Sequence, residues 1–494
     1  MKHVINTALD AISVSGLDYG DIRVVNRTTQ NLSTRNTVVE AVESTSSLGF
    51  GIRVLYRGFW GFGASNDLSS QSIKETAKKA LQIAKASASV GLKKVKLYPV
   101  KPVQAKYQTP LKIDPFTVSL NTKINTLLSC DKIMVKVKNV TTVQSFMRSW
   151  REEKIFASTE GAYIEQILTE TGAGFDCLAT DGKEAQNRSF PNSFRGQFKT
   201  CGYELLDELK LHEHAQQIAE EAVLLLKAKE CPAGEFDIIL DGNQLALQIH
   251  ESCGHPTELD RVLGYEAAYA GTSFMNIDGL GKLKYGSDIV NLTADSITPG
   301  GLGTFGFDDE GVPAGKHYLV KNGIHVGYLT SRETLPVLIN KVKNKKSKAQ
   351  SNIDLTLTSA MRADGWSNIP LVRMVNVSLE PGIWKYDDLI SDTKYGLLMS
   401  TNRSWSIDDR RINFQFGTEI AYEIKNGKKT GRIFKNPIYS GITPSFWNSC
   451  DAICNKESWT IWGTPNCGKG EPSQLAHTGH GASPARFRKV RVGR

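Results

Sequence analysis

The chain has 494 residues, and single hydrophobic cores stop growing well below that length, so roughly three domains are expected. Hydrophobic residues make up 40% and charged residues 22%, which is enough apolar material to fill cores and excludes a disordered chain. The net charge of +9 is concentrated in a lysine-rich run at 341–348 and a basic tail at 485–494. No recognised nucleic-acid module accompanies these clusters, so a solvated loop and a solvated tail are favoured over nucleic-acid binding.

The cysteines and the apolar runs indicate where the protein resides. Its eight cysteines contain no C-x-x-C pair, and a chain of this size does not need a disulfide scaffold. Residues 1–16 include an aspartate and a histidine and lack the uninterrupted apolar core of a signal peptide. No run of about 18 apolar residues occurs, so no membrane-spanning helix is expected. These features predict a cytoplasmic protein without a membrane segment.

The first predicted domain, 1–92, combines helices with a sheet. Its expected elements are a helix at 3–14, strands at 21–27, 37–44 and 48–63, and an amphipathic helix at 69–88 that begins with serine. We interpret these elements as an α-β-β-β-β-α unit. A segment at 93–110 rich in lysine, proline and valine is typical of a connector.

The second predicted domain, 93–230, is rich in strands. Its expected elements are a helix at 116–129, long antiparallel strands over 132–150 and 153–182, and a long helix at 203–228. The sequence Pro-Ala-Gly at 232–234 indicates the boundary to the next domain.

The third predicted domain, 231–494, opens with a buried strand at 235–241 and is otherwise dominated by strands. Asn-Gly pairs at 322–323 and 426–427 predict hairpins, because these residues supply the positive φ angles of a type I′ turn. The expected fold class is α+β, with a helix-plus-sheet N-terminal region and a β-rich C-terminal catalytic domain.

The helix after the first strand of this domain carries the sequence H-E-x-x-x-H. Two imidazoles that flank a carboxylate can hold zinc while the carboxylate handles protons, as in the shorter H-E-x-x-H motif. His250 and His255 would lie about 140° apart on an ideal helix, so a π-bulge is needed to bring them to one face. Gly254 relaxes the backbone there and Pro256 has no N–H to lose. We therefore predict a helix over 242–255 with a widened last turn and Glu251 beside the metal.

A hydrolytic zinc normally has three protein ligands and one open position. The pattern alone leaves the third ligand open among Cys467, His477, His480, Glu258 and Asp260. Cys253 lies inside the motif but points away from both histidines if they converge, so it is expected to be a packing residue.

The sequence resembles the TldD/PmbA family of zinc metallopeptidases. "HESCGH" at 250–255 and "NCGKG" at 466–470 carry the resemblance, supported by similar blocks at 49–65, 303–314, 369–382 and 402–428. The lysine-rich run at 341–348 is a departure, since a shorter connection is expected there. The likeness covers most of the chain, which makes it far more specific than a short motif.

The resemblance implies a site, a reaction and a partner. It implies that His250, His255 and Cys467 bind Zn²⁺ and that Glu251 is the general base for the hydrolysis of short or unfolded polypeptides. It also implies a dimer, formed either with a second copy or with a TldE/PmbA-type subunit that lacks the metal motif. Because all four residues are present, the chain resembles the metal-bearing, TldD-type subunit.

Two rival functions remain at the level of the sequence. One is a binding protein in which zinc is structural and the basic loop and tail engage nucleic acid or an acidic partner. The other is an enzyme with Cys253 as nucleophile and His250 as base. His477 and His480 could assist the metal reaction or lie in an inert loop. The acidic run at 308–310 could recognise a peptide amine or support the site, but a polar turn beside a strand explains it at least as well. The charged run at 408–411 is interpreted as an ion-paired turn.

Overall fold

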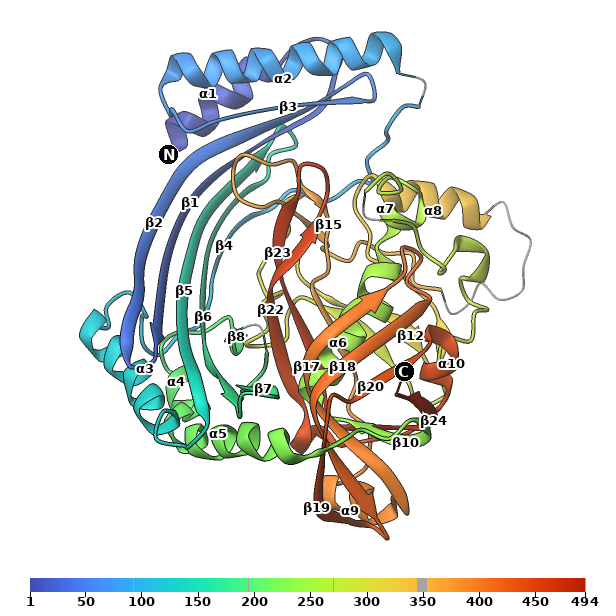
Figure 1. The fold of residues 1–494 in the computed structure, drawn as a ribbon. Helices are drawn as coiled ribbons and strands as arrows, with labels where there is room; N and C mark the ends of the chain where they lie inside the picture. The colour runs from blue at the N-terminus through green and yellow to red at the C-terminus, as the bar shows by residue number, and fades with distance from the viewer. Residues whose placement is uncertain (92, 194, 270, 344–352, 494) are drawn as a thin grey trace.

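The computed structural model describes residues 1–91, 93–193, 195–269, 271–343 and 353–493. The strands of its N-terminal half are β1 Leu17–Arg35, β2 Val38–Tyr56, β3 Phe59–Ser65, β4 Gln104–Gln108, β5 Val140–Ser158, β6 Tyr163–Thr180, β7 Ala185–Phe190 and β8 Gln197–Lys199. They form one mostly antiparallel sheet in the order β3-β2-β1-β5-β6-β4, with β7 and β8 also paired to β6. The predicted domains 1–92 and 93–230 therefore share a sheet, which sweeps in a long curve along one side of the molecule (Figure 1).

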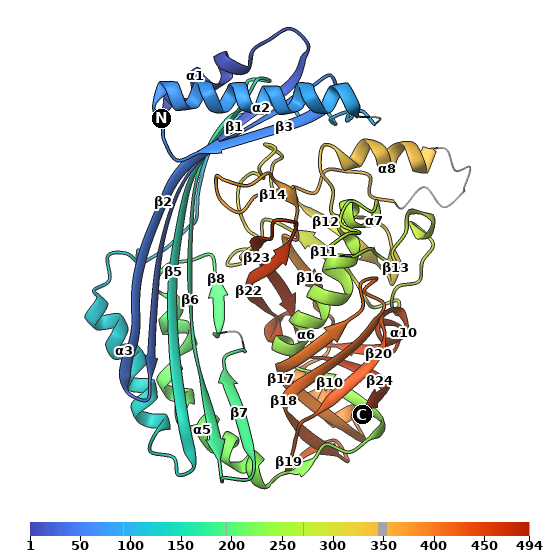
Figure 2. The ribbon, with the colours of Figure 1, turned by 45° about the horizontal axis from the view of Figure 1, so that its top comes forward.

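Helices cover one face of this sheet at its two ends (Figure 2). They are α1 Lys2–Ile12 and α2 Ser70–Val90 at one end, and α3 Leu120–Met134, α4 Leu205–Leu209 and α5 Leu211–Lys227 at the other. Side chains alternate along a strand, so Ile22, Val24 and Leu32 of β1 all point to the helix-covered face and join its two apolar cores. The opposite, concave face is left for the C-terminal region (Figure 1).

Three local features of the N-terminal half differ from the sequence-based prediction. The serine-rich stretch at 44–47, predicted to separate two strands, stays paired within β2. Both faces of β2 are exposed there, so polar side chains are tolerated. The chain turns instead at Arg57 and Gly58, with φ of 49° and 87°, so the unit is α-β-β-β-α and the predicted fourth strand is absent from 1–91. The predicted helix at 203–228 is interrupted at Lys210, whose φ is 46°.

The C-terminal region contains a ring of strands and a second sheet. Its strands are β9 Lys229–Glu230, β10 Gly234–Leu240, β11 Leu292–Asp295, β12 Lys316–Lys321, β13 Ile324–His325, β14 Met361–Arg362, β15 Leu371–Val372, β16 Asn376–Leu379, β17 Tyr395–Ile407, β18 Asn413–Lys425, β19 Lys428–Lys435, β20 Ile438–Ile442, β21 Cys450–Ile453, β22 Thr460–Lys469, β23 Gln474–Ala482 and β24 Ala485–Val492. The order β17-β10-β24-β20-β18 closes into a ring because β17 also pairs with β18. The second sheet runs β13-β12-β11-β16-β23-β22.

Helices connect and cover these sheets. They are α6 Gly242–Ile249, α7 Leu259–Val262, α8 Thr334–Lys343, α9 Tyr386–Asp392 and α10 Thr443–Asn448. Of these, α6 packs against β17 of the ring and β23 of the second sheet, so it lies where the two sheets meet. None of the helices in the described ranges is long and apolar enough to cross a membrane.

The α+β fold with a β-rich C-terminal region is confirmed, and so are both predicted hairpins. Asn322 and Gly323, with φ of 48° and 74°, join β12 to β13. Asn426 and Gly427, with φ of 52° and 71°, join β18 to β19. Of the lysine-rich run at 341–348, Lys341 and Lys343 end α8, whereas 344–348 lie outside the described residues.

The basic tail is not the solvated segment that the sequence suggested. Residues 485–492 form β24, which lies between β10 and β20 in the ring. Arg486 is buried and its guanidinium binds Asp392 at 2.8 Å and Asp451 at 2.9 Å. Arg488 binds Asp237 at 2.7 Å. These charges are neutralised within the protein, so the tail offers less free positive charge to nucleic acid than its sequence implied.

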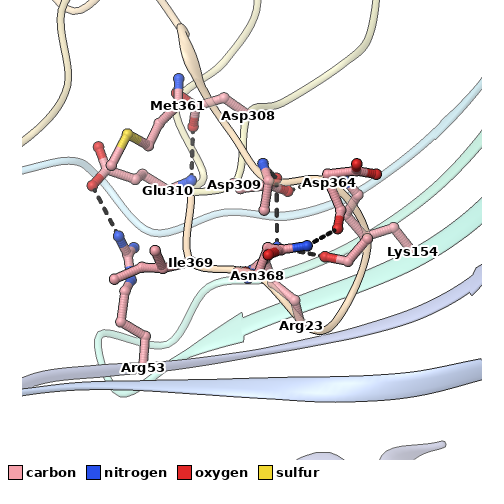
Figure 3. Close-up of polar contacts among 12 residues, drawn as sticks. Arg23, Arg53, Lys154, Asp308, Asp309, Glu310, Met361, Asp364, Asn368 and Ile369 are labelled. Atoms are coloured by element: carbon pink, nitrogen blue, oxygen red, sulfur yellow. Dashed lines mark hydrogen bonds and ion pairs between the residues drawn. The ribbon is translucent and has the colours of Figure 1, made fainter. Parts of the chain in front are cut away.

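The acidic run at 308–310 forms a polar turn as predicted, with the N–H of Gly311 bonded to the Asp308 carbonyl at 3.1 Å, but the turn is buried and lies against side chains of the N-terminal sheet (Figure 3). Lys154 Nζ lies 2.8 Å from a carboxylate oxygen of Asp309. Arg53 lies 2.6 Å from Asp21 and 3.5 Å from Glu310. All of these side chains are buried, so each half of the molecule supplies the counter-charges that the other half requires.

Candidate metal centre

The histidine motif lies where α6 gives way to a wider turn. Asp241 caps α6 by accepting a hydrogen bond from the backbone N–H of Gly242 at 2.8 Å. Residues 250–254 then form a π-helix, in which the N–H of His255 bonds to the carbonyl of His250. The extra residue in this turn brings both histidines to one side, as the spacing predicted. Their rings lie with centroids 4.9 Å apart, at 89° to each other.

Cys467 of β22 meets the two histidines from the far end of the chain. The side-chain donor atoms of His250, His255 and Cys467 all lie within 4.8 Å of one another, and all three residues are buried. The sulfur is 3.8 Å from Nε2 of His255, which precedes it by 212 residues. Of the third ligands that the sequence left open, Cys467 is thus the one brought into the trio. Two imidazoles and a sulfur converging at this separation could hold one metal ion.

His480 of β23 fixes the orientation of His250. Nδ1 of His480 lies 2.9 Å from the Val377 carbonyl, which can only accept a hydrogen bond. Burial lowers the pKa of His480, so its ring is neutral and its Nε2 must accept the hydrogen bond from Nδ1 of His250, 2.7 Å away. This arrangement leaves the lone pair of His250 on Nε2, where a metal ion could use it.

Glu258 plays the same part for His255. Its carboxylate lies 3.0 Å from Nδ1 of His255, which therefore donates and keeps its lone pair on Nε2. Burial would raise the pKa of Glu258, but Lys469 at 3.3 Å, together with His255, holds that pKa well below its usual range. Asp260 binds Lys469 at 2.8 Å. Glu258 and Asp260, both candidates for the third ligand, therefore lie behind the trio and support it.

The protonation states of the trio suit metal binding. Burial lowers the pKa values of His250 and His255, which favours neutral imidazoles. Burial by itself would raise the pKa of the Cys467 thiol, but the nearby His255 and Arg373 outweigh it and lower that pKa. Metal ligands must be neutral imidazoles and thiolates, so the chemistry of these residues fits a metal ion.

Glu251 faces a cavity of about 280 Å³ beside the trio. Its carboxylate forms an ion pair with Arg411, which follows β17 and also lines this cavity. Nε of Arg411 is buried without a hydrogen-bond partner in the structure, so a donor remains available there. The sequence predicted an ion-paired turn at 408–411; the turn is present, with the N–H of Arg411 bonded to the Asp408 carbonyl at 2.8 Å, but the guanidinium of Arg411 pairs with Glu251. The two partners are 160 residues apart, and no local pattern connects them.

The remaining candidates from the sequence lie away from the trio. Cys253 is fully buried in the apolar core, and burial raises the pKa of its thiol, which suits a packing residue and not a nucleophile. His477 and His480 are three positions apart on β23 and therefore project from opposite faces. His477 lies 2.5 Å from Glu170 of the N-terminal sheet and its ring is 4.4 Å from that of Trp150. A role for His477 as a donor at the metal finds no support in this position.

Two neutral imidazoles, a thiol with a lowered pKa and an adjacent carboxylate beside one cavity form a donor set suited to a metal-dependent hydrolase. Models of the PmbA/TldA metallopeptidase family match the chain in three parts: domain 1 over 20–84, the central domain over 113–226 and the C-terminal domain over 233–494. The chain is 32% identical to a metalloprotease of Methanocaldococcus jannaschii, over 88% of this chain and 89% of that one. It is 28% identical to a metalloprotease of Methanothermobacter thermautotrophicus, over 97% and 96%.

The fold has solved relatives as well. TldE from Thermococcus kodakarensis superposes over 100% of both chains with a TM-score of 0.69, at 15% sequence identity. The chain therefore belongs to the PmbA/TldA metallopeptidase family, and the resemblance noted in its sequence is confirmed. It is a metal-dependent peptidase.

Proposed function

We propose that the protein is a zinc peptidase that hydrolyses peptide bonds in short or unfolded polypeptides. The observation that carries this proposal is the convergence of His250, His255 and Cys467 in one buried cavity with Glu251. A mixed set of imidazole and thiolate ligands favours zinc over the harder cations. Structural zinc sites have four protein ligands, whereas the cluster formed by the described residues has three, and that number favours a catalytic ion.

Each residue of the site is proposed to have a separate role in the hydrolysis. When bound, zinc supplies a Lewis acid that lowers the pKa of water from 15.7 toward about 7. Glu251 accepts the proton of the attacking water and returns it to the leaving amine. Arg411 neutralises and orients the Glu251 carboxylate through their ion pair. Glu258 and His480 hold the two imidazoles in the tautomer that presents Nε2.

The substrate is proposed to bind as an extended chain. β22 is the last strand of its sheet, and its segment from Thr464 to Gly468 borders the cavity that contains Glu251. Main-chain pairing along a strand edge gives affinity with little dependence on sequence, which suits unfolded polypeptides. Such a site excludes compact domains, whose backbones are already paired.

The test of this proposal is a Glu251→Gln variant. The substitution keeps the shape of the side chain but removes the base, so we expect full zinc content and loss of peptide hydrolysis by at least about 100-fold. Zinc is measured by metal analysis and turnover by cleavage of a casein-derived peptide mixture. The matched control is Glu457→Gln, at an exposed position outside the cavity. Retained turnover in Glu251→Gln with bound zinc would eliminate the general base.

We also propose a cytoplasmic dimer. All eight cysteines are free, which suits a reducing compartment. The partner is either a second copy of the chain or a metal-free TldE/PmbA-type subunit, a choice motivated by the likeness of the fold to TldE. Light scattering on the purified chain, alone and mixed with such a subunit from the same organism, distinguishes the two.

A further inference from the structure

A second cavity, of about 500 Å³, lies between the concave face of the N-terminal sheet and the C-terminal region. Its lining includes Arg148 of β5, Arg195 of the segment between β7 and β8, and Asn466 of β22. Asn466 immediately precedes Cys467 and also lines the cavity that holds Glu251. The two cavities therefore adjoin, and a substrate in one can extend into the other.

Arg148 and Arg195 differ from the neighbouring arginines in having no acidic partner. Within the described ranges neither forms an ion pair, whereas Arg27 on the same face binds Glu152 and Asp364 at 2.8 and 2.7 Å. Arg148 is half-buried, and its buried Nε has no hydrogen-bond partner among the described residues, whereas Arg195 is exposed. A half-buried guanidinium without a counter-charge is costly, so a ligand with the opposite charge would be bound favourably at Arg148.

Aromatic rings hold both guanidinium groups in place. Arg148 lies over the Trp150 ring at 4.6 Å from its centroid, and Arg27 lies over the same ring at 4.5 Å. The guanidinium of Arg195 lies 5.1 Å from the centroid of the Phe146 ring. Phe146 precedes Arg148 by two positions on β5. Such stacking restricts the guanidinium planes while their N–H edges stay free, which prepares them for a planar ligand such as a carboxylate.

Two acidic side chains, Glu40 and Glu43, also line this cavity, and Glu43 accepts a hydrogen bond from Asn31 Nδ2 at 3.5 Å. Glu40 lies 2.9 Å from Arg35 and 2.6 Å from Gln144. Glu170, the acid with the strongest influence on Arg148, binds His477. Burial lowers the pKa of Arg148, and the like charges of Arg195 and Arg27 lower it further, although Glu170 opposes them. In the described ranges neither Glu40 nor Glu43 forms an ion pair with Arg148 or Arg195, so both guanidinium groups remain available to an anionic ligand.

We propose that Arg148 and Arg195 form a subsite for a carboxylate of the peptide substrate, so that the enzyme prefers peptides carrying an anionic group beside the cleaved bond. This proposal rests on the proposed function, because it places the substrate in the cavity that adjoins the metal centre. The carboxylate is either the C-terminus of the peptide or an acidic side chain, and both present the same planar group to the arginines.

The experiment uses one peptide in four forms, with a free or amidated C-terminus and with glutamate or glutamine next to the cleaved bond. Binding is measured to zinc-loaded Glu251→Gln enzyme, and cleavage to the zinc-loaded wild type. We expect Kd and KM to be roughly ten-fold lower for one carboxylate form than for its amide. A preference for the free terminus identifies the C-terminal carboxylate, and a preference for glutamate identifies the side chain.

Substitution of the two arginines tests whether they cause the preference for a carboxylate. Arg148→Gln and Arg195→Gln should each abolish the carboxylate preference while binding as much zinc as the wild type, and the zinc content shows that the variants fold. The matched control is Arg57→Gln at the β2–β3 turn, where an exposed arginine stacks on Tyr56 at 5.3 Å and is outside both cavities. If both variants keep the carboxylate preference, as Arg57→Gln should, the subsite is refuted.

Failure of the subsite and failure of the proposed function give different results. Cleavage of all four peptides at equal KM would overturn the subsite and leave the peptidase standing. A carboxylate preference in binding that depends on Arg148 and Arg195, without cleavage by the zinc-loaded wild type, would support the subsite and refute the peptidase.

Discussion

His250 and His255 could each adopt either tautomer in isolation, and only one tautomer presents Nε2 to a metal ion. The choice is made by neighbours that are not ligands: His480 accepts from the first imidazole and Glu258 from the second. Each neighbour is fixed in turn, His480 by the Val377 carbonyl and Glu258 by Lys469. Metal affinity at this site should therefore depend on residues that never touch the ion.

Replacement of His480 by alanine tests that dependence. The change leaves the Nδ1–H of His250 without an acceptor and frees its ring to rotate, so we expect zinc affinity to fall by about 10- to 100-fold. Competition with a chromophoric chelator measures this affinity without reference to activity. His477→Gln serves as the control, since it alters a histidine of the same strand that faces Glu170. Equal zinc affinities in the two variants would contradict the role of His480.

The π-helical turn at 250–254 positions the two histidines, and at Gly254 it packs directly against the buried side chain of Met374. A Cβ added to Gly254 would lie 2.0 Å from Sδ of Met374, well inside van der Waals contact. The wide turn thus depends on a residue without a side chain at this position, in addition to the unusual spacing of the histidines.

Gly254→Ala should therefore destabilise the protein and disturb the site together. We expect overpacking to cost about 1 to 3 kcal/mol in the free energy of unfolding, accompanied by weaker zinc binding. In the double variant Gly254→Ala/Met374→Ala the added methyl group finds room, so its cost should be smaller than the sum of the single changes. Urea denaturation of all four proteins measures this coupling. Strictly additive free energies would show that the contact with Met374 is not the cause.

At the scale of the whole molecule, buried ion pairs join the curved N-terminal sheet to the C-terminal region. Glu152 of β5 belongs to this seam through Arg27, which also binds Asp364 across the junction. Burial alone would raise the pKa of Glu152, but Lys154 and Arg27 outweigh it and lower that pKa to about 2. A carboxyl group with a lowered pKa stabilises the folded state above its unfolded pKa, and this stabilisation is lost as the pH falls toward the folded value.

The seam should consequently weaken in acid. Glu152 contributes about 3 kcal/mol at neutral pH, and this contribution should disappear as the pH falls from about 4.5 to about 2. Urea denaturation of wild type and Glu152→Gln at successive pH values measures it as the difference between the two proteins. That difference should shrink across this window and stay constant above it. A difference that does not vary with pH would show that the ionised carboxylate is not responsible.

Short-range patterns along the chain were enough to predict several elements and the meeting of the two histidines of the motif. Period-two and helical spacing located the helices and the long strands of the N-terminal half, Asn-Gly pairs predicted both hairpins, and the i, i+5 spacing before Pro256 predicted the wide turn that brings His250 and His255 together. The polar stretch Ser-Thr-Ser-Ser at 44–47 led to a wrong strand end, because strand propensity does not take into account that a strand exposed on both faces tolerates polar residues.

Tertiary structure alone decided which distant groups meet. Pattern left five candidates for the third ligand, and only the packing of β22 and β23 against α6 brought Cys467 to the histidines and placed His480 behind His250. The pairing of Arg411 with Glu251 and the burial of the charged runs at 308–310 and 485–492 have the same origin. The physical reason is that oppositely charged groups far apart in the chain come together only when the sheets pack. No spacing along the chain predicts which of these groups will meet.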